Sequence, residues 1–224
     1  RSPWGRFRLL SFRMCRPMKA QGNQPIALFK RHPRTDPRTL VMHNQVYRLG
    51  ELSAAYYESA LVISRKFDGQ ATFDTFLLPY LFLMRHAFEL SLKDGIIVLK
   101  ELKIEHFAAD PEVAFNYMSP IDYVTDIGHN LMKLFNEFKR EYNSFDFMEQ
   151  FPKGIETALN LLHQADKSST EFRYGTQPQD EPSYIDSKSL CKELSEQFRK
   201  LEAVIDYAHD TCSYLPIRHA KQHK

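Results

Sequence analysis

Residues 74–102 read DTFLLPYLFLMRHAFELSLKDGIIVLKEL, and this stretch decides the fold. Its residues are apolar on nearly every side of a helix, a pattern typical of a helix at the centre of a bundle. We predict a helix from Asp74, as its N-cap, to Leu102, with Pro79 tolerated in the first turns. The uninterrupted apolar run 76–84 is about half of the roughly 20 residues that a membrane span needs, so we expect a buried helix and no membrane partner.

Four other segments space their apolar residues three and four apart, which gives a helix one buried face. These segments are 49–66, 129–142, 153–167 and 187–212. Residues 106–128 carry two prolines and predict a long connecting insertion with little regular structure. Residues 169–186 predict an ordered loop or small hairpin, in which EFRY is strand-like. The predicted fold class is therefore all-α, an up-and-down bundle of about five helices.

The net charge of +2 is unevenly distributed along the chain. Residues 1–38 carry ten Lys or Arg and one acid, Asp36, so the remainder has a net charge of about −7. We divide the chain into a basic N-terminal arm (1–45), a helical bundle (46–214) and a C-terminal tail (215–224). The arm begins without Met, and two interpretations of it stay open. Its first residues, 1–17, are not native to the chain, or the arm is a disordered segment that contacts nucleic-acid phosphates without sequence specificity.

The three cysteines, Cys15, Cys191 and Cys212, have no metal-ligand spacing and leave one thiol over in any disulfide scheme. This usage fits a reducing, cytoplasmic environment and predicts neither a structural metal nor a disulfide scaffold. The sequence also contains no HExxH, GxSxG, P-loop or GxGxxG motif. The familiar hydrolase, kinase and dinucleotide-binding classes are therefore not indicated, and we expect no metal and no cofactor.

Ionisable residues interrupt the central helix at Arg85, His86, Glu89 and Lys93. Arg85, Glu89 and Lys93 are four residues apart and form one file of positive, negative and positive groups. Because buried charges without partners cost several kcal/mol each, other segments must supply partners to this file. We expect His86 to pack between helices.

Two short segments offer suitable partners, GHNL at 128–131 and EFRYG at 171–175. His129 and Asn130 lie at the start of a helix, where free backbone N–H groups favour an anion. Arg173 lies between Phe172 and Tyr174, which could hold its guanidinium by stacking. We predict that Arg85, Glu89, Lys93, His129 and Arg173 converge on one pocket, mostly cationic and suited to a phosphate. A closed salt-bridge network without any ligand explains the same residues equally well.

The segments PYLFLMRHAFELSLK, GHNLMKLF and EFRYG together resemble bacterial helical-bundle proteins related to the HEPN superfamily, over roughly residues 49–213. The resemblance implies an α-helical domain that dimerises and acts in toxin–antitoxin or phage-defence settings. It implies a possible RNA or nucleotide ligand, a partner such as an antitoxin or nucleotidyltransferase and, in many relatives, metal-independent RNA cleavage. HEPN ribonucleases carry an arginine and, four to six residues later, a histidine on a late helix. Here only Arg38–His43 and Arg218–His223 have that spacing, and neither lies within a predicted helix.

The expected chemistry can nevertheless be assigned to residues. If RNA is cleaved, we expect a metal-independent endoribonuclease in which His129, Arg85 and Glu89 are catalytic, with His129 as base or acid and Glu89 orienting a cation. Lys93, Asn130, Arg173 and Tyr174 would bind the ligand. Two alternatives stay open: a non-catalytic module that binds nucleotide or RNA or forms a dimer, and a buried polar network with a purely structural role.

Overall fold

The computed structural model describes residues 48–67, 75–107, 119–145, 147–175 and 185–214. All of them belong to the unit Val46–Lys224. Several predictions lie outside these residues: the basic arm, the N-cap at Asp74, the C-terminal tail, and the motifs Arg38–His43 and Arg218–His223.

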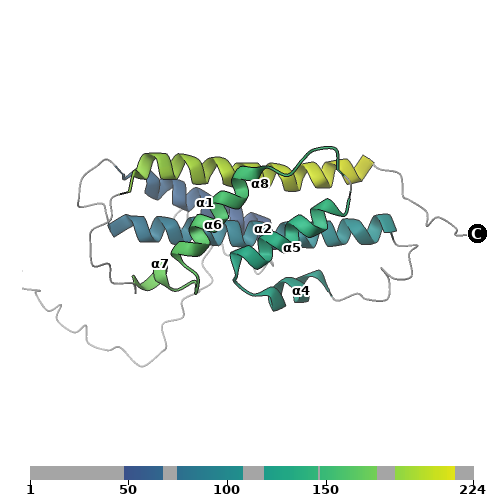
Figure 1. Cartoon of the computed structure of the whole chain (residues 1–224), viewed down its shortest axis with the longest axis horizontal. Helices are drawn as coiled ribbons and strands as arrows, with labels where there is room; N and C mark the ends of the chain where they lie inside the picture. Colours follow the sequence, from purple (N-terminus) through teal and green to yellow (C-terminus); the bar gives the residue numbers. More distant parts are fainter. Residues whose placement is uncertain (1–47, 68–74, 108–118, 146, 176–184, 215–224) are drawn as a thin grey trace, which may run out of the picture. The chain divides into compact units, whose positions relative to one another are not determined.

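The described secondary structure is entirely helical (Figure 1). The helices are α1 (Leu49–Ser64), α2 (Leu77–Phe107), α4 (Pro120–Ile127), α5 (Leu131–Asn143), α6 (Lys153–Ala165), α7 (Glu171–Tyr174) and α8 (Ser187–Tyr214). The predicted all-α bundle is confirmed, and the five predicted helices correspond to α1, α2, α5, α6 and α8. None of the helices in the described ranges is long and apolar enough to cross a membrane.

Helix α2 is the centre of the bundle, because α1, α4, α5, α6, α7 and α8 all pack against it. Its core side chains have no exposed surface: Tyr80, Met84, Phe88, Leu92, Ile96 and Leu99. Pro79 is the third residue of the helix, where a missing N–H costs no hydrogen bond because the first four N–H groups have no partner within the helix. The apolar pattern around the helix thus correctly predicted its central position.

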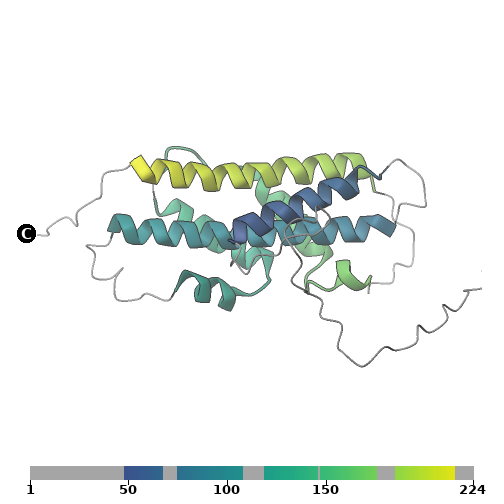
Figure 2. The same ribbon diagram turned by 180° about the vertical axis from the view of Figure 1, so that it is seen from behind.

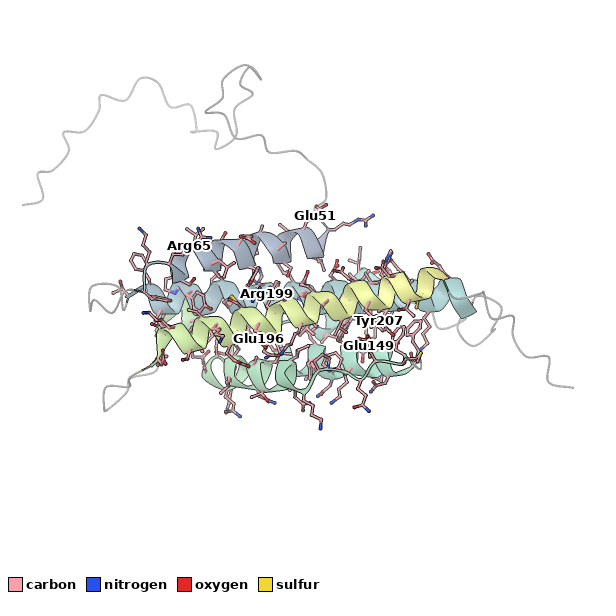
Figure 3. All side chains as sticks on the ribbon, turned by 90° about the horizontal axis from the view of Figure 1, so that it is seen from above. Glu51, Arg65, Glu149, Glu196, Arg199 and Tyr207 are labelled. Carbon is pink, nitrogen blue, oxygen red and sulfur yellow. The ribbon has the colours of Figure 1, made fainter. Side chains whose placement is uncertain are left out.

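Helix α1 runs antiparallel to α2, whereas α8 runs parallel to it. Gly50 at the start of α1 lies against Asp94, while Ser53 Oγ donates to the carbonyl of Ala87 farther back along α2. On α8, in contrast, Phe198 lies against Phe88 of α2, and Ile205, farther along α8, lies at Gly95, farther along α2. Figures 1 and 2 show α8 alongside α2, and Figure 3 shows α8 between α1 on one side and α5 and α6 on the other.

Helix α5 also runs parallel to α2, and α6 returns antiparallel to α5. The start of α5 lies at Arg85 of α2 and its end at Lys100. The directions therefore alternate from α1 to α2 and from α5 to α6, but α2, α5 and α8 run the same way. All three helices meet at Gly95, where a Cβ atom would come within 2.6 Å of Phe138 and 3.0 Å of Ile205.

The predicted insertion 106–128 contains a helix that the sequence pattern does not predict. Helix α2 continues to Phe107, and α4 occupies Pro120–Ile127. Pro120 is the first residue of α4, a position that suits its fixed φ, and Val124 is buried on α2 and α5. The prediction of little regular structure is therefore wrong at both ends of this insertion. Residues 108–118 lie outside the described part.

The EFRY segment is also helical, so the strand-like prediction is wrong. It forms the single turn of α7, from Glu171 to Tyr174. The Asp166 carboxylate accepts the N–H of Glu171 at 3.1 Å, and Gly175 ends the turn in the left-handed conformation with φ 60°. Local capping therefore outweighs the strand propensity of Phe and Tyr.

Candidate functional site

The file of charges on α2 forms as predicted. Glu89 accepts from Arg85 Nη1 at 3.2 Å and from Lys93 Nζ at 2.9 Å. Arg85 is 3% exposed and Glu89 2% exposed, so both charged groups are buried. Packing of α2 on all sides places this ion pair in the interior, where it depends on fixed partners.

The third buried member, Asp166, was not identified from the sequence. Asp166 is the C-cap of α6 and has no exposed surface, and its Oδ2 lies 3.4 Å from Arg85 Nε. Its other carboxylate oxygen caps α7 through the N–H of Glu171. In the sequence, Asp166 looks like an ordinary polar helix end. The one indication in the sequence was that Glu89 alone cannot balance both Arg85 and Lys93, so a second acidic residue had to lie near Arg85.

His129 joins the cluster from the residue before the N-cap of α5. Its Nδ1 lies 2.6 Å from Glu89 Oε1, and its backbone carbonyl accepts from Arg85 Nη2 at 2.9 Å. The preceding residue, Gly128, has φ 76° and ψ −134°, a conformation that favours glycine. The histidine side chain is nevertheless 72% exposed. Glu89 and Arg85 therefore fix a histidine that faces solvent.

Arg173 does not join this cluster. Its Nε donates to the carbonyl of Ser169 at 2.7 Å, and its guanidinium carbon lies 5.7 Å from the centre of the Phe82 ring. The stacking partner is thus Phe82 of α2, not Phe172 or Tyr174. Phe172 is buried, whereas Tyr174 is 70% exposed.

Asn130 has a local structural role in addition to its position near His129. It is the N-cap of α5, and its Oδ1 accepts the N–H of Lys133 at 3.0 Å. The N-cap of α5 is therefore Asn130 and not its neighbour His129. This leaves the His129 ring free to interact with Glu89.

His86 packs between helices, as expected from the sequence. Its ring lies edge-on to Tyr56 of α1, with centroids 4.4 Å apart, and parallel to Phe82, at 6.0 Å. Burial lowers the pKa of His86, and the positive charges of Lys93 and Arg85 lower it further, against the opposing effect of Glu89.

The charges of the cluster nearly cancel, in contrast to the predicted cationic pocket. Two carboxylates, Glu89 and Asp166, face the two cations Arg85 and Lys93. Burial alone would raise the pKa of Glu89, but hydrogen bonds and charge from Lys93 and His129 outweigh burial and lower it. Glu89 is therefore a carboxylate at neutral pH. Arg85 and Lys93 therefore do not form a phosphate-binding site by themselves, because both are paired with carboxylates.

Asp166 and Glu171 divide their protons unequally. Burial, together with hydrogen bonding to Glu171, raises the pKa of Asp166. Hydrogen bonding to Asp166 and Ser168 lowers the pKa of Glu171 to about 2. As the pH rises, Glu171 therefore loses its proton before Asp166 does, and the first negative charge of the pair lies on Glu171, at the surface.

The geometry around His129 fits acid–base chemistry. Because a carboxylate only accepts hydrogen bonds, Glu89 holds the proton of neutral His129 on Nδ1. The lone pair of Nε2 is then the basic site of a side chain that is largely exposed. A buried carboxylate behind an exposed imidazole orients the ring and stabilises its protonated form.

A second ionic cluster lies farther along α2, at its contact with α5. Lys100 Nζ and Lys103 Nζ lie 3.2 and 3.3 Å from the carboxylate of Glu141, and Arg140 Nη2 lies 3.1 Å from it. Burial alone would raise the pKa of Glu141, but the hydrogen bond from Arg140 and the charges of both lysines lower it. No histidine takes part in the interactions of this cluster within the described residues.

Within the same residues, no group of three or more His, Cys, Asp or Glu is placed to hold a metal ion. Comparison with protein-family models, with curated proteins and with solved structures finds no match to this chain.

Proposed function

We propose that this protein is a HEPN-like helical-bundle protein that cleaves RNA without a metal ion, with His129 as its acid–base residue. One observation carries the proposal: the 2.6 Å contact between the buried Glu89 carboxylate and Nδ1 of the exposed His129. The resemblance of the three sequence segments to HEPN-related proteins gives the substrate class.

The proposed reaction is a transesterification. His129 Nε2 takes the proton of a ribose 2′-hydroxyl, and the resulting oxygen attacks the adjacent phosphorus. The bond to the 5′ oxygen breaks, and that oxygen takes a proton from water. The products are a 2′,3′-cyclic phosphate and a 5′-hydroxyl end.

The other residues act mainly through His129. Glu89 orients the imidazole and stabilises its positive charge, and Arg85 fixes the backbone of His129 through its carbonyl. Lys93 and the positive end of α5, capped by Asn130, favour the negative charge that develops on phosphate. Arg85 is a positioning residue in this scheme, because Glu89 and Asp166 already balance its charge.

The test is cleavage of a labelled mixed-sequence RNA in EDTA by the wild type and by His129→Ala, His129→Gln and Glu89→Gln variants. His209→Ala, an exposed histidine on α8, is the matched control. Circular dichroism and melting curves establish that each variant is folded.

We expect His129→Ala and His129→Gln to lose cleavage by a factor of about 10²–10⁴, the usual contribution of a general acid or base. Glu89→Gln should retain partial activity, and His209→Ala should match the wild type. Full activity in folded His129→Ala would refute the assignment of His129.

A second candidate function is a non-catalytic module that binds RNA or a nucleotide, or that forms a dimer. The near cancellation of charge in the cluster favours a non-catalytic role over catalysis, and a dimer or a structural network over RNA binding, because a closed network needs no ligand. Binding of RNA by the wild type without any turnover would support it. A lower melting temperature in Arg85→Ala, with no change in RNA binding or cleavage, would support a purely structural network.

The resemblance also supports proposals about the setting of the protein. These are a homodimer, a cytoplasmic location, and a role in toxin–antitoxin or phage defence with an antitoxin or nucleotidyltransferase partner. Light scattering of the purified chain tests the dimer directly: a mass of 26.3 kDa, that of one chain, would exclude it under those conditions.

A further inference from the structure

A small cavity lies between the end of α5, the segment leading into α6, and α8. Its volume is about 150 Å³, and Tyr142, Glu149, Pro152, Lys200, Val204 and Tyr207 are among its lining residues. Tyr142 follows Asn130 by twelve residues on α5, so the cavity lies roughly 18 Å from the Glu89–His129 pair along that helix. It is a separate feature of the fold.

Two tyrosines line the cavity: Tyr207, which is half-buried, and Tyr142, which is only 3% exposed, and other rings hold both in place. The Tyr142 hydroxyl donates to the carbonyl of Glu149 at 3.3 Å, and its ring packs on Phe147 with centroids 4.7 Å apart. Tyr207 meets the same Phe147 edge-on at 5.7 Å. Aromatic faces carry the negative part of the ring quadrupole and attract cations.

The one lining carboxylate, that of Glu149, adds a negative charge. Glu149 is exposed, and across the described residues its carboxylate makes no ion pair. Figure 3 shows Glu149 beside Tyr207 of α8. Burial, followed by the proximity of Tyr207 and Glu149, raises the pKa of Tyr142 to about 12, so this wall stays uncharged at neutral pH.

Lys200 contributes little positive charge to the cavity. Its Nζ lies 2.7 Å from Glu196 Oε1, one turn toward the start of α8. The cavity is bounded on α8 by Ala203, Val204 and Tyr207, toward the other end of the helix. The methylene chain of Lys200 can therefore line the cavity while its ammonium group is held by Glu196.

We propose that this cavity binds a small methylated ammonium group, held against the ring of Tyr207 beside Tyr142 and neutralised by Glu149. A volume of about 150 Å³ admits a compact group such as trimethylammonium but leaves little room for a larger ligand. The proposal does not depend on RNA cleavage, because it shares no residue with the Glu89–His129 pair.

The test compares two ligands of one shape. Choline and its neutral isostere, in which a tert-butyl group replaces trimethylammonium, are titrated into the full chain and followed by NMR. We expect choline to bind in the millimolar range and the isostere to bind roughly tenfold more weakly, a difference typical of cation–π recognition. Equal binding of the two ligands, or no binding of choline, would overturn the proposal.

Variants locate the site. Glu149→Gln and Tyr207→Leu should each weaken choline binding severalfold, whereas Asp210→Asn, an exposed acid on the same helix, should leave it unchanged. Glu196→Gln should also weaken binding, because it releases the charge of Lys200 beside the cavity. Unchanged affinity in folded Glu149→Gln and Tyr207→Leu would place the bound choline elsewhere and refute this site.

Discussion

Two ionic clusters lie along the same helix, α2, and both centre on a buried glutamate, but they differ in their cations. Around Glu89 the side chains of Arg85 and Lys93 are only 4% and 12% exposed. Around Glu141 the side chains of Lys103 and Arg140 are 35% and 64% exposed. Lys103 and Arg140 of the second cluster can therefore reach water, whereas Arg85 and Lys93 of the first are held in the interior.

This difference shows that the role of a charged group depends more on how deeply its partners are buried than on their residue type. In the Glu89 cluster the buried charged groups pair with one another, and Glu89 and Arg85 also hold His129, so its position is fixed. In the Glu141 cluster, long basic side chains reach from the solvent to one carboxylate. These contacts hold α5 on α2, but the charged ends of the side chains are not fixed. Only the first cluster combines a fixed geometry with an exposed histidine side chain.

The largest difference should come from removing the central acid of each cluster. Glu89→Ala leaves Arg85 and Lys93 buried with one acid fewer, and should lower the free energy of unfolding by about 3–5 kcal/mol. Glu141→Ala frees cations that can move into water, and should cost about 1 kcal/mol. Urea denaturation of both variants measures the difference. Equal losses would mean that the two clusters do not differ in this respect.

A backbone substitution next to the first cluster should have an intermediate effect. Gly128→Ala places a side chain at φ 76° and ψ −134°, and should cost about 1–3 kcal/mol through strain alone, because no atom lies within 4 Å of the added Cβ. The His129 carbonyl and ring should shift with it. If cleavage is confirmed, Gly128→Ala should lower activity as well as stability. Wild-type stability in this variant would contradict the strained geometry.

Acid should weaken the first cluster in a defined pH range. The pKa of Glu89 lies below its ordinary value of 4.5, so the folded state binds the proton less readily than the unfolded state. The stability that this carboxylate contributes is therefore fully present above about pH 4.5 and is lost as the pH falls through its folded pKa. The difference in unfolding free energy between wild type and Glu89→Gln should shrink over that range. A difference independent of pH would disprove the lowered pKa.

The smallest effect is expected at the rim of the second cluster. Lys103→Ala removes one of three cations around Glu141 and should cost less than about 1 kcal/mol. The loss should diminish further in 1 M salt, where the screening length is about 3 Å. Thermal melts at low and high salt test this, with Lys100→Ala, which is more buried, as the comparison.

Periodicity predicted the long helices because a buried face leaves a direct record in the sequence. The apolar residues around α2 indicated its central place, and the spacing of Arg85, Glu89 and Lys93 indicated the file of charges. The same periodicity contains no information about direction, so the parallel course of α2, α5 and α8 could not be derived. That course depends on return segments, one of which includes α4.

The short elements were missed because local capping decides them. Helix α7 forms where a buried Asp166 caps the N–H of Glu171 and Gly175 ends the turn, and no apolar period is long enough to signal it. Asp166 itself was missed because its partner, Arg85, is 81 residues away in sequence. Arg173 was placed wrongly for a related reason: Phe82, on which it stacks, is distant in sequence, whereas Phe172 and Tyr174 are its neighbours.

The contact between α2 and α8 joins segments that are far apart in the sequence, so it can form only late in synthesis of the chain. Ser91 and its partner Glu202 are 111 residues apart. At a synthesis rate of about 5–20 residues per second, Ser91 is added to the growing chain roughly 5–20 seconds before Glu202. During that interval α1, which precedes α2 and packs along it, is already available to cover one side, but the side destined for α8 has no cover from within the chain. The most apolar segment of this protein therefore spends seconds in need of protection before its last partner is synthesised.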